Sequence, residues 1–160
     1  MQSNRPDVLA EVAALFARYE EALTRDDAEA VVAFFAPEAV RFGVADHQIG
    51  LAEQLAWRRA QPPLPPGRTL HDTTIAGYGA DVAVVTTFFS YPGRVVAGRQ
   101  SQTWVRMPQG WRIVTAHVSE PAVHMSEPAA HVSEPAAPAA GGSFQAPSAK
   151  ASSMSSVNTS

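Results

Sequence analysis

The sequence predicts an α+β fold in which helices come first and an antiparallel sheet follows. Apolar residues recur at helical spacing over residues 7–24. From residue 68 onward the pattern changes to β-branched and aromatic runs, which short turns containing Gly and Pro separate. These connections are too short for the crossovers that parallel strands require, so the strands are expected to pair as antiparallel hairpins.

The first helix is expected over residues 7–24. Pro6 lies near its first turn, where a missing backbone N–H has no cost. Tyr19 falls on the apolar stripe of this helix. Its phenol therefore has two interpretations: a core residue with a satisfied hydroxyl, or a group that points into a cavity.

Two shorter helices follow. Asp26 or Asp27 is expected to cap the second, with Glu29 in the capping-box position relative to Asp26. Pro37 is expected to end it. The third helix is expected over residues 51–59.

Extended segments make up the rest of the domain. A short strand at 40–44 and an extended piece at 48–50 precede the third helix, and a stiff, exposed proline-rich loop at 61–67 follows it. Four longer strands are then expected, at 68–76, 82–91, 95–107 and 111–119. The strand at 82–91 is so rich in β-branched and aromatic residues that burial of much of both its faces is predicted.

Composition excludes several classes of function. At 160 residues the chain is expected to form one domain, and a hydrophobic share of 46% suffices for its core. A formal net charge of −3 provides no basic excess for nucleic acid or for a membrane surface. No apolar run approaches the roughly 18 residues of a spanning helix, and the first residues do not resemble a secretory leader. The absence of cysteine excludes disulfides and thiolate chemistry and fits a cytoplasmic protein.

The last part of the chain, residues 120–160, is expected to be a disordered tail outside a domain of residues 1–119. HVSEPA-like heptads begin at His117, His124 and His131, and an Ala-, Pro- and Ser-rich end follows. A proline in every repeat excludes a coiled coil. No metal site is predicted from the three histidines, because they belong to a flexible repeat.

Candidate functional residues gather in the segment Val40–Gly50. Arg41 stands on a short apolar strand, and Asp46 and His47 follow it closely. Strand alternation places Arg41 on the face opposite Phe42. A solvated arginine is one interpretation, but the apolar neighbours favour the wall of a pocket for a small anion.

Three segments resemble the AtzH-like family, which includes HpxZ-type proteins of oxalurate catabolism and belongs to the NTF2-like (SnoaL-like) superfamily. They are FARYEEAL (16–23), VRFGVADHQIG (40–50) and GRQSQTWVRMPQGWRIVTAHVS (98–119). The resemblance covers about residues 7–119 and does not extend to the tail. The second and third segments are the more specific ones, although the Gly-Trp-Arg-Ile-Val motif is generic in the superfamily.

This resemblance implies a fold and a class of ligand. The fold would be an NTF2-like cone, a curved antiparallel β-sheet wrapped around the N-terminal helices, with a pocket at its open end and a homodimer through the convex sheet face. The family implies small nitrogen-rich substrates. One branch resembles an amidohydrolase of carboxylated urea in cyanuric acid breakdown, and another belongs to purine and oxalurate pathways. The site positions that match the family's pattern are Tyr19, Arg41, His47 and Gly50.

By analogy with the superfamily, strand alternation assigns further residues to the pocket. On the last strand His117 shares a face with Trp111, and this face looks inward in the superfamily. On the preceding strand Gln100 and Gln102 are expected to face inward. Their amides suit a substrate that carries both hydrogen-bond donors and acceptors.

Together these residues suggest hydrolysis of a small anionic ureido or carboxylated amide ligand. Arg41 matches a carboxylate with its guanidinium fork, and a second cation is expected from Arg58 or Arg59. Tyr19 would donate to an oxyanion or orient a water molecule. Neither H-E-x-x-H nor G-x-S-x-G occurs, so neither a metal nor another cofactor is expected.

Proton transfer near neutral pH would fall to His47 or His117. An alternative is a non-catalytic binding or accessory module of the same pathway. A weaker alternative is an isomerase of the ketosteroid type, which needs a carboxylate base inside the cone. Asp72 is the only strand acid to nominate, and its other interpretation is a solvated strand end.

Overall fold

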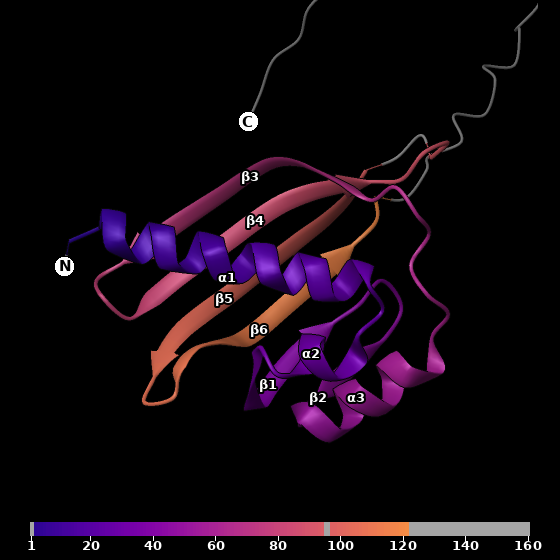
Figure 1. Ribbon diagram of the computed structural model, residues 1–160, viewed down its shortest axis with the longest axis horizontal. Coiled ribbons are helices and arrows are strands. Elements are labelled where there is room, and N and C mark those ends of the chain that lie inside the picture. Colours follow the sequence, from indigo (N-terminus) through magenta and orange to yellow (C-terminus); the bar gives the residue numbers. More distant parts are fainter. Residues whose placement is uncertain (1, 95–96, 122–160) are drawn as a thin grey trace, which may run out of the picture. The chain divides into compact units, whose positions relative to one another are not determined.

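The computed structural model describes residues 2–94 and 97–121 (Figure 1). The helices are α1 (Pro6–Thr24), α2 (Ala28–Val32) and α3 (Gly50–Ala60). The strands are β1 (Phe35–Phe42), β2 (His47–Ile49), β3 (Thr69–Tyr78), β4 (Val82–Ser90), β5 (Gly98–Met107) and β6 (Gly110–Ser119). The predicted α+β class and the order of its elements are confirmed, whereas the predicted tail lies almost wholly outside the described residues.

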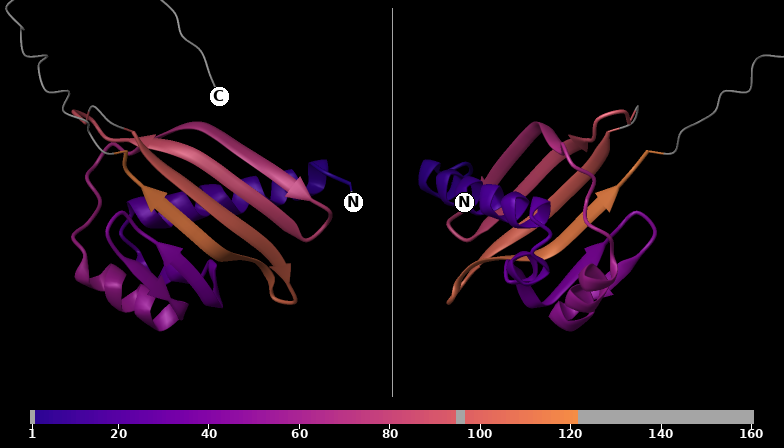
Figure 2. Two further views of the ribbon diagram at one scale, coloured as in Figure 1. Left: turned by 180° about the vertical axis from the view of Figure 1, so that it is seen from behind. Right: turned by 45° about the vertical axis from the view of Figure 1, so that its right-hand side comes forward.

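The strands form one sheet in the order β2-β1-β6-β5-β4-β3. Strands β3 to β6 are antiparallel neighbours, as predicted. β1 is parallel to β6 and antiparallel to β2. Helix α1 lies across one face of the sheet, and no described element covers the opposite face (Figures 1 and 2).

The core lies between α1 and the sheet. The apolar stripe of α1 is buried at Val8, Val12 and Phe16. It packs against inward-facing residues of the sheet, among them Trp104 and Ile113, which are fully buried. None of the helices in the described ranges is long and apolar enough to span a membrane.

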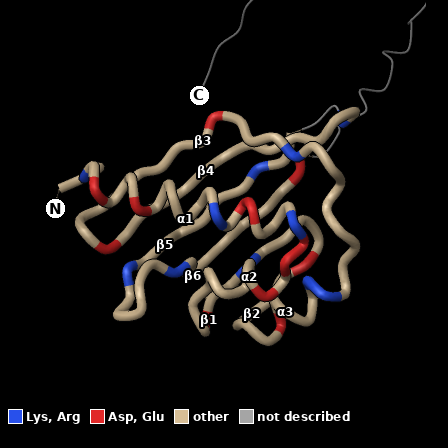
Figure 3. Tube along the Cα trace, in the orientation of Figure 1, with Lys and Arg blue, Asp and Glu red and all other residues tan. Residues whose placement is uncertain are grey.

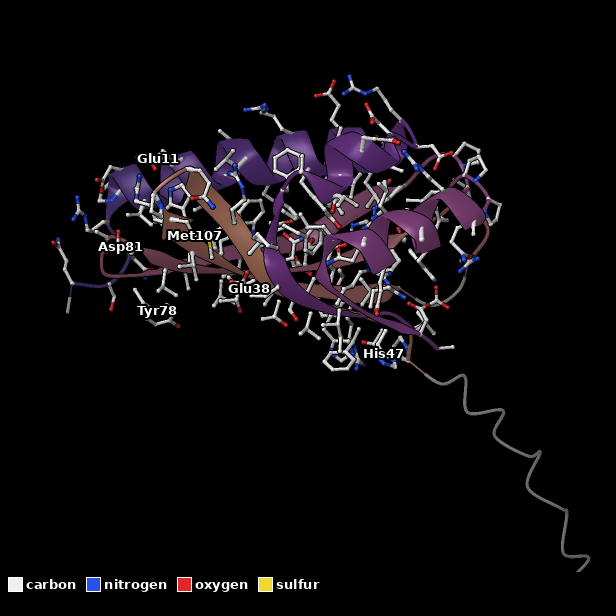
Figure 4. The ribbon with its side chains drawn as sticks, turned by 90° about the horizontal axis from the view of Figure 1, so that it is seen from below. Glu11, Glu38, His47, Tyr78, Asp81 and Met107 are labelled. Atoms are coloured by element: carbon white, nitrogen blue, oxygen red, sulfur yellow. The ribbon has the colours of Figure 1, made fainter. Side chains whose placement is uncertain are left out.

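A polar cluster attaches α1 to the turn between β5 and β6. The Trp111 indole donates a hydrogen bond of 2.7 Å to Glu11, and the Arg106 guanidinium lies 2.7 Å from the same carboxylate. Arg106 also stacks on the Trp111 ring at 4.6 Å. The indole hydrogen bond, and then Arg106, lower the pKa of Glu11 even though desolvation opposes the shift. Glu11 can be located on α1 in Figure 4.

The predicted end of the second helix is wrong. Asp27 is the cap and accepts a hydrogen bond of 3.0 Å from the Ala30 amide, while Asp26 has a positive φ of 58°. The helix ends at Val32, and Pro37 lies inside β1. The register of β1 against β6 shifts within this stretch, and a missing N–H is tolerated at such an irregularity.

The prediction that much of both faces of β4 would be buried is also wrong. Alternate residues such as Val85 and Thr87 are buried, but Thr86 and Phe88 face outward, and Phe88 is 43% exposed. The β-branched residues of this strand therefore reflect its pairing in an antiparallel sheet, not a second layer on its outer face.

Strand β6 carries a β-bulge that decides which side chains face the helix. Its pairing with β5 shifts between Thr103 and Trp104, which leaves Val114 as an extra residue. Ile113 is buried before the bulge and Ala116 after it. Odd-numbered residues therefore face inward in the first half of β6, and even-numbered ones in the second half.

Candidate functional site

A cavity of about 240 Å³ lies where the C-terminal end of α1, helix α3, the 61–67 loop and the ends of the central strands meet. Basic and acidic residues lie close together around this end of the helices (Figure 3). Four arginines from different parts of the chain line the cavity: Arg41, Arg58, Arg68 and Arg94.

Arg41 reaches the cavity from β1 and is held on one side only. Its Nη1 donates to Asp46 at 2.8 Å and to Gln48 at 2.7 Å, and its guanidinium carbon lies 4.2 Å from the Trp57 ring centroid. Its Nε and Nη2 donate to no residue that the structure describes. These two atoms form the edge of a guanidinium that binds a carboxylate with two parallel hydrogen bonds. The predicted alternation is confirmed, since Arg41 is 8% exposed and Phe42 is 50% exposed.

Of the two arginines expected to supply a second cation beside Arg41, Arg58 lines the cavity and Arg59 does not. Arg58 lines the cavity and has no carboxylate within ion-pair distance among the described residues, and its buried Nε has no hydrogen-bond partner there. Arg59 points outward and pairs with Glu29. Burial, and then the charge of Arg58, lower the pKa of Arg41.

Tyr19 is buried like a core residue, but no described residue satisfies its hydroxyl as the core interpretation requires. Its ring packs among those of Phe16, Phe34 and Phe35, with centroids 6.4, 5.9 and 6.2 Å away, and the residue is only 3% exposed. It also lines the cavity. Its hydroxyl forms no hydrogen bond with any residue in the described ranges, which leaves it available to a ligand.

The two glutamines of β5 face inward as predicted, but only one lines the cavity. Gln100 is 4% exposed and lines the cavity. Gln102 is 2% exposed and lies deeper, where its Oε1 accepts a hydrogen bond of 3.0 Å from the Trp104 indole. Its Nε2 is buried without a partner among the described residues.

The expectation that His47 and His117 line the pocket is wrong. Both are exposed on the outer face of the sheet, where they flank Phe42 with ring centroids 6.4 and 6.2 Å from it. The β6 bulge turns Val118 toward the cavity in place of His117, and the pairing of β2 turns Gln48 inward in place of His47. Figure 4 shows His47 on the side of the sheet away from α1.

Asp72 is not a base inside the fold. It is exposed on β3, where φ is 50° and the pairing with β4 is irregular, and it does not line the cavity. The isomerase alternative therefore loses its nominated residue. Within residues 2–94 and 97–121, no group of three or more His, Asp or Glu residues is placed to hold a metal ion.

Sequence reasoning missed Arg68 and Glu20. They form a buried ion pair at 3.0 Å at the edge of the cavity. Glu20 follows Phe16 by four residues and so falls on the apolar stripe of α1, which is a signal for a buried carboxylate. Arg68 follows the proline-rich loop, where no periodicity indicates its environment.

The family model described as AtzH-like matches residues 1–123. No curated protein matches the chain. A solved structure from Pectobacterium atrosepticum, of a DUF3225-family protein of unknown function, is 45% identical with a TM-score of 0.72 and covers 75% of this chain and 95% of its own. A cystatin-like fold protein from Burkholderia xenovorans is also 45% identical with a TM-score of 0.72, over 76% and 98% of the two chains.

More distant structures show the fold alone. An NTF2-like protein of unknown function from Pseudomonas putida is 18% identical with a TM-score of 0.61 and covers 72% of this chain and 88% of its own. A putative ketosteroid isomerase from Parabacteroides distasonis is 20% identical with a TM-score of 0.59, over 68% and 86%. The fold is therefore NTF2-like, as the resemblance in the sequence implied.

Proposed function

Because the chain belongs to the AtzH-like family and has an NTF2-like fold, we propose that it is a cofactor-independent hydrolase. It splits a linear amide C–N bond of a small urea-derived dicarboxylate of the 1,3-dicarboxyurea type, in the breakdown of nitrogen heterocycles such as cyanuric acid, or of purines or oxalurate. One observation carries the proposal: the unused hydroxyl of Tyr19 and the unused edge of Arg41 belong to the same cavity.

The size of the cavity supports a small substrate. Its volume of about 240 Å³ lies below the range of about 300–1,000 Å³ of sites for drug-sized ligands. A ureido carboxylate with few heavy atoms fits such a volume.

The reaction assigns separate roles to the residues of the cavity. Arg41 and Arg58 bind a carboxylate and fix the carbonyl beside it. Water adds to the carbonyl carbon, a C–O bond forms, and the Tyr19 hydroxyl donates a hydrogen bond to the oxygen that becomes negative. The C–N bond then breaks, and the proton that the water loses ends on the leaving nitrogen. The balance is one water consumed for each C–N bond broken.

One observation favours the alternative of a non-catalytic binding module. No histidine is found among the described residues that line the cavity, so the imidazole expected to transfer protons near neutral pH is not among them. A protein that only binds the same anion needs no such group.

The quaternary structure belongs to the same proposal. The outer sheet face exposes apolar side chains, including Phe42 at 50% and Phe88 at 43%. The family resemblance suggests a homodimer through this face. Sedimentation equilibrium of the full chain tests it, and a monomer at concentrations well above those of the activity assay contradicts it.

The function is tested by offering the purified chain a panel of small ureido and carboxylated amide compounds and measuring release of ammonia or carbon dioxide. Tyr19→Phe removes only the unused hydroxyl, so kcat should fall by about 10²–10³, as for the loss of one oxyanion donor. Tyr78→Phe is the matched control, because Tyr78 is 47% exposed outside the cavity, and it should keep full activity.

The outcomes separate the two functions. Turnover by the native chain that Tyr19→Phe loses and Tyr78→Phe retains supports the hydrolase. Tight binding of a panel compound with no product by mass spectrometry supports the binding module. Folded Tyr19→Phe and Arg41→Ala variants with full activity contradict the proposed site.

A further inference from the structure

Arg68 is almost completely buried at the cavity, which is unusual for an arginine side chain. Its side chain is 5% exposed, and it donates hydrogen bonds from Nε to Glu20 at 3.0 Å and from Nη2 to Gln100 at 2.9 Å. Nη1 lies 3.4 Å from the Tyr91 hydroxyl, and the guanidinium carbon lies 4.0 Å from the Phe89 ring centroid. The residue thus has polar partners on three of its sides and an aromatic ring on one face.

Gln100 completes a closed cycle of hydrogen bonds with Arg68 and Glu20. Its Oε1 accepts from Arg68, and its Nε2 donates to Glu20 at 2.7 Å. Each of the two Glu20 oxygens therefore has one donor, and the orientation of the Gln100 amide is fixed. Burial alone would lower the pKa of Arg68, but the charge and hydrogen bond of Glu20 outweigh it, so the pKa is raised and Arg68 stays a cation.

The Arg68 site (Arg68, Glu20, Gln100 and Phe89) has the same composition as the Arg41 site (Arg41, Asp46, Gln48 and Trp57). In both, a carboxylate and a glutamine oxygen accept from the guanidinium, and an aromatic ring lies about 4 Å from its carbon. Both arginines line the same cavity. They lie toward opposite edges of the sheet, since Arg41 is on β1 and Arg68 directly precedes the edge strand β3.

Stability alone does not account for the Arg68 site. Burying an ion pair costs desolvation, and well-packed apolar residues of similar volume are often as stable or more stable. A guanidinium has five N–H bonds, and the three hydrogen bonds to Glu20, Gln100 and Tyr91 leave two, one on each Nη. An oriented cation with unused donors at a cavity is suited to bind an anion.

We infer that Arg68 is a specificity-determining residue, which binds the second carboxylate of the ligand while Arg41 binds the first, and that Glu20 and Gln100 position its guanidinium. The inference rests on the proposed function only for the ligand's identity, because two such arginine sites in one small cavity call for an anionic group at each end, with or without turnover.

Binding calorimetry with two related probes tests this. Malonate has a carboxylate at both ends, and malonamate replaces one of them by a neutral amide of similar shape. The native chain should bind malonate at least about tenfold more tightly, since charge-assisted hydrogen bonds are roughly twice as strong as neutral ones. In Arg68→Gln this preference should disappear, with malonamate affinity changed less than threefold. Arg94→Gln is the control, because Arg94 lines the same cavity but is half-exposed and paired with Glu120.

Arg68→Gln leaves the buried Glu20 without its counter-charge and can fail to fold for that reason. The double variant Glu20→Gln/Arg68→Gln removes both charges and keeps three hydrogen-bonding side chains, so it provides a folded reference. It should also lose the preference for malonate. The inference is overturned if either folded variant still prefers malonate, or if it loses affinity for malonate and malonamate equally. Absence of turnover in the native chain contradicts the hydrolase and leaves this binding result intact.

Discussion

Arg41 and Arg58 approach the same indole ring, that of Trp57, with guanidinium carbons 4.2 and 5.9 Å from its centroid. Arg41 has a counter-charge in Asp46 at 2.8 Å, whereas Arg58 has none among the residues that the structure describes. Burial and the charge of Arg58 lower the pKa of Arg41, but its guanidinium stays a cation because the ordinary pKa of arginine lies far above neutral pH. Their mutual repulsion is relieved when an anion binds, so this end of the cavity is prepared for a negative charge.

Removing the charge of Arg58 should weaken binding without harming the fold. In Arg58→Gln we expect the Kd for malonate to rise about tenfold or more, since a hydrogen bond to a charged group contributes about 1.5–3 kcal/mol. The free energy of unfolding should not fall, because the substitution also removes the repulsion of Arg41 and a buried Nε that has no partner among the described residues. Calorimetry and thermal melts measure the two quantities. Arg59→Gln is the matched control, because its side chain is exposed and paired with Glu29. An equal loss of affinity in that control would refute the assignment.

The absence of a side chain at Gly43 is needed for the position of Asp46. A Cβ at Gly43 would lie 2.4 Å from the nearer Asp46 oxygen. Gly43→Ala should therefore displace the carboxylate from Arg41 and lower malonate affinity about threefold to tenfold, or about 0.7–1.4 kcal/mol, which lies within the range of about 0.5–3 kcal/mol for coupled neighbours. In an Asp46→Ala background, Gly43→Ala should have no further effect. Additive losses in the double variant would show that Gly43 acts by another route.

Gly98 gives space to a neighbouring aromatic ring. Its Cβ position lies 2.1 Å from the Phe89 ring, which belongs to the cross-strand partner of Gly98 on β4. Gly98→Ala should destabilise the chain by about 1–3 kcal/mol through overpacking. Because Phe89 also stacks on Arg68, the preference for malonate should weaken as well. Denaturant melts measure the first effect, and adding Phe89→Leu should recover part of the stability. An unchanged melt of Gly98→Ala contradicts the close contact.

Acid should weaken the attachment of α1 at Glu11. Its pKa in the folded chain is below the ordinary value of 4.5, chiefly because the Trp111 indole donates to it. A lowered folded-state pKa contributes stability above the ordinary value, and this contribution is lost as the pH falls through the lowered one. Urea melts from pH 7 to pH 2 should show Glu11→Gln less stable at neutral pH, with the two curves converging in acid. A constant offset at all pH values contradicts the linkage.

Local patterns were sufficient for much of the fold and for Arg41. Helical spacing indicated α1 within one residue of its bounds, and the short turns indicated the hairpins of β3 to β6. Alternation over Val40–Phe42 placed Arg41 inward, because β1 is regular there. Tyr19 required the family resemblance as well, since periodicity alone does not distinguish a core phenol from a cavity phenol.

Pairing between strands decided what local patterns did not predict. His117 was assigned inward by counting along β6, and the count changes at Val114 because β5 has no matching residue there. The hydrogen-bonded cycle of Arg68, Glu20 and Gln100 joins residues that are 32 to 80 positions apart, so no short sequence motif indicates it. Packing of α1 against the sheet brings these residues together, and it depends on the whole domain.

The bulge at Val114 also has an evolutionary consequence. Loss of the codon for Val114 would remove the bulge and leave the inward-facing residues unchanged, because Ile113, Ala116 and Val118 would then alternate regularly. His117 would still face outward, so an imidazole in this cavity requires a substitution such as Val118→His. Two homologues whose β6 strands differ in length by one residue can therefore present the same side chains to the cavity.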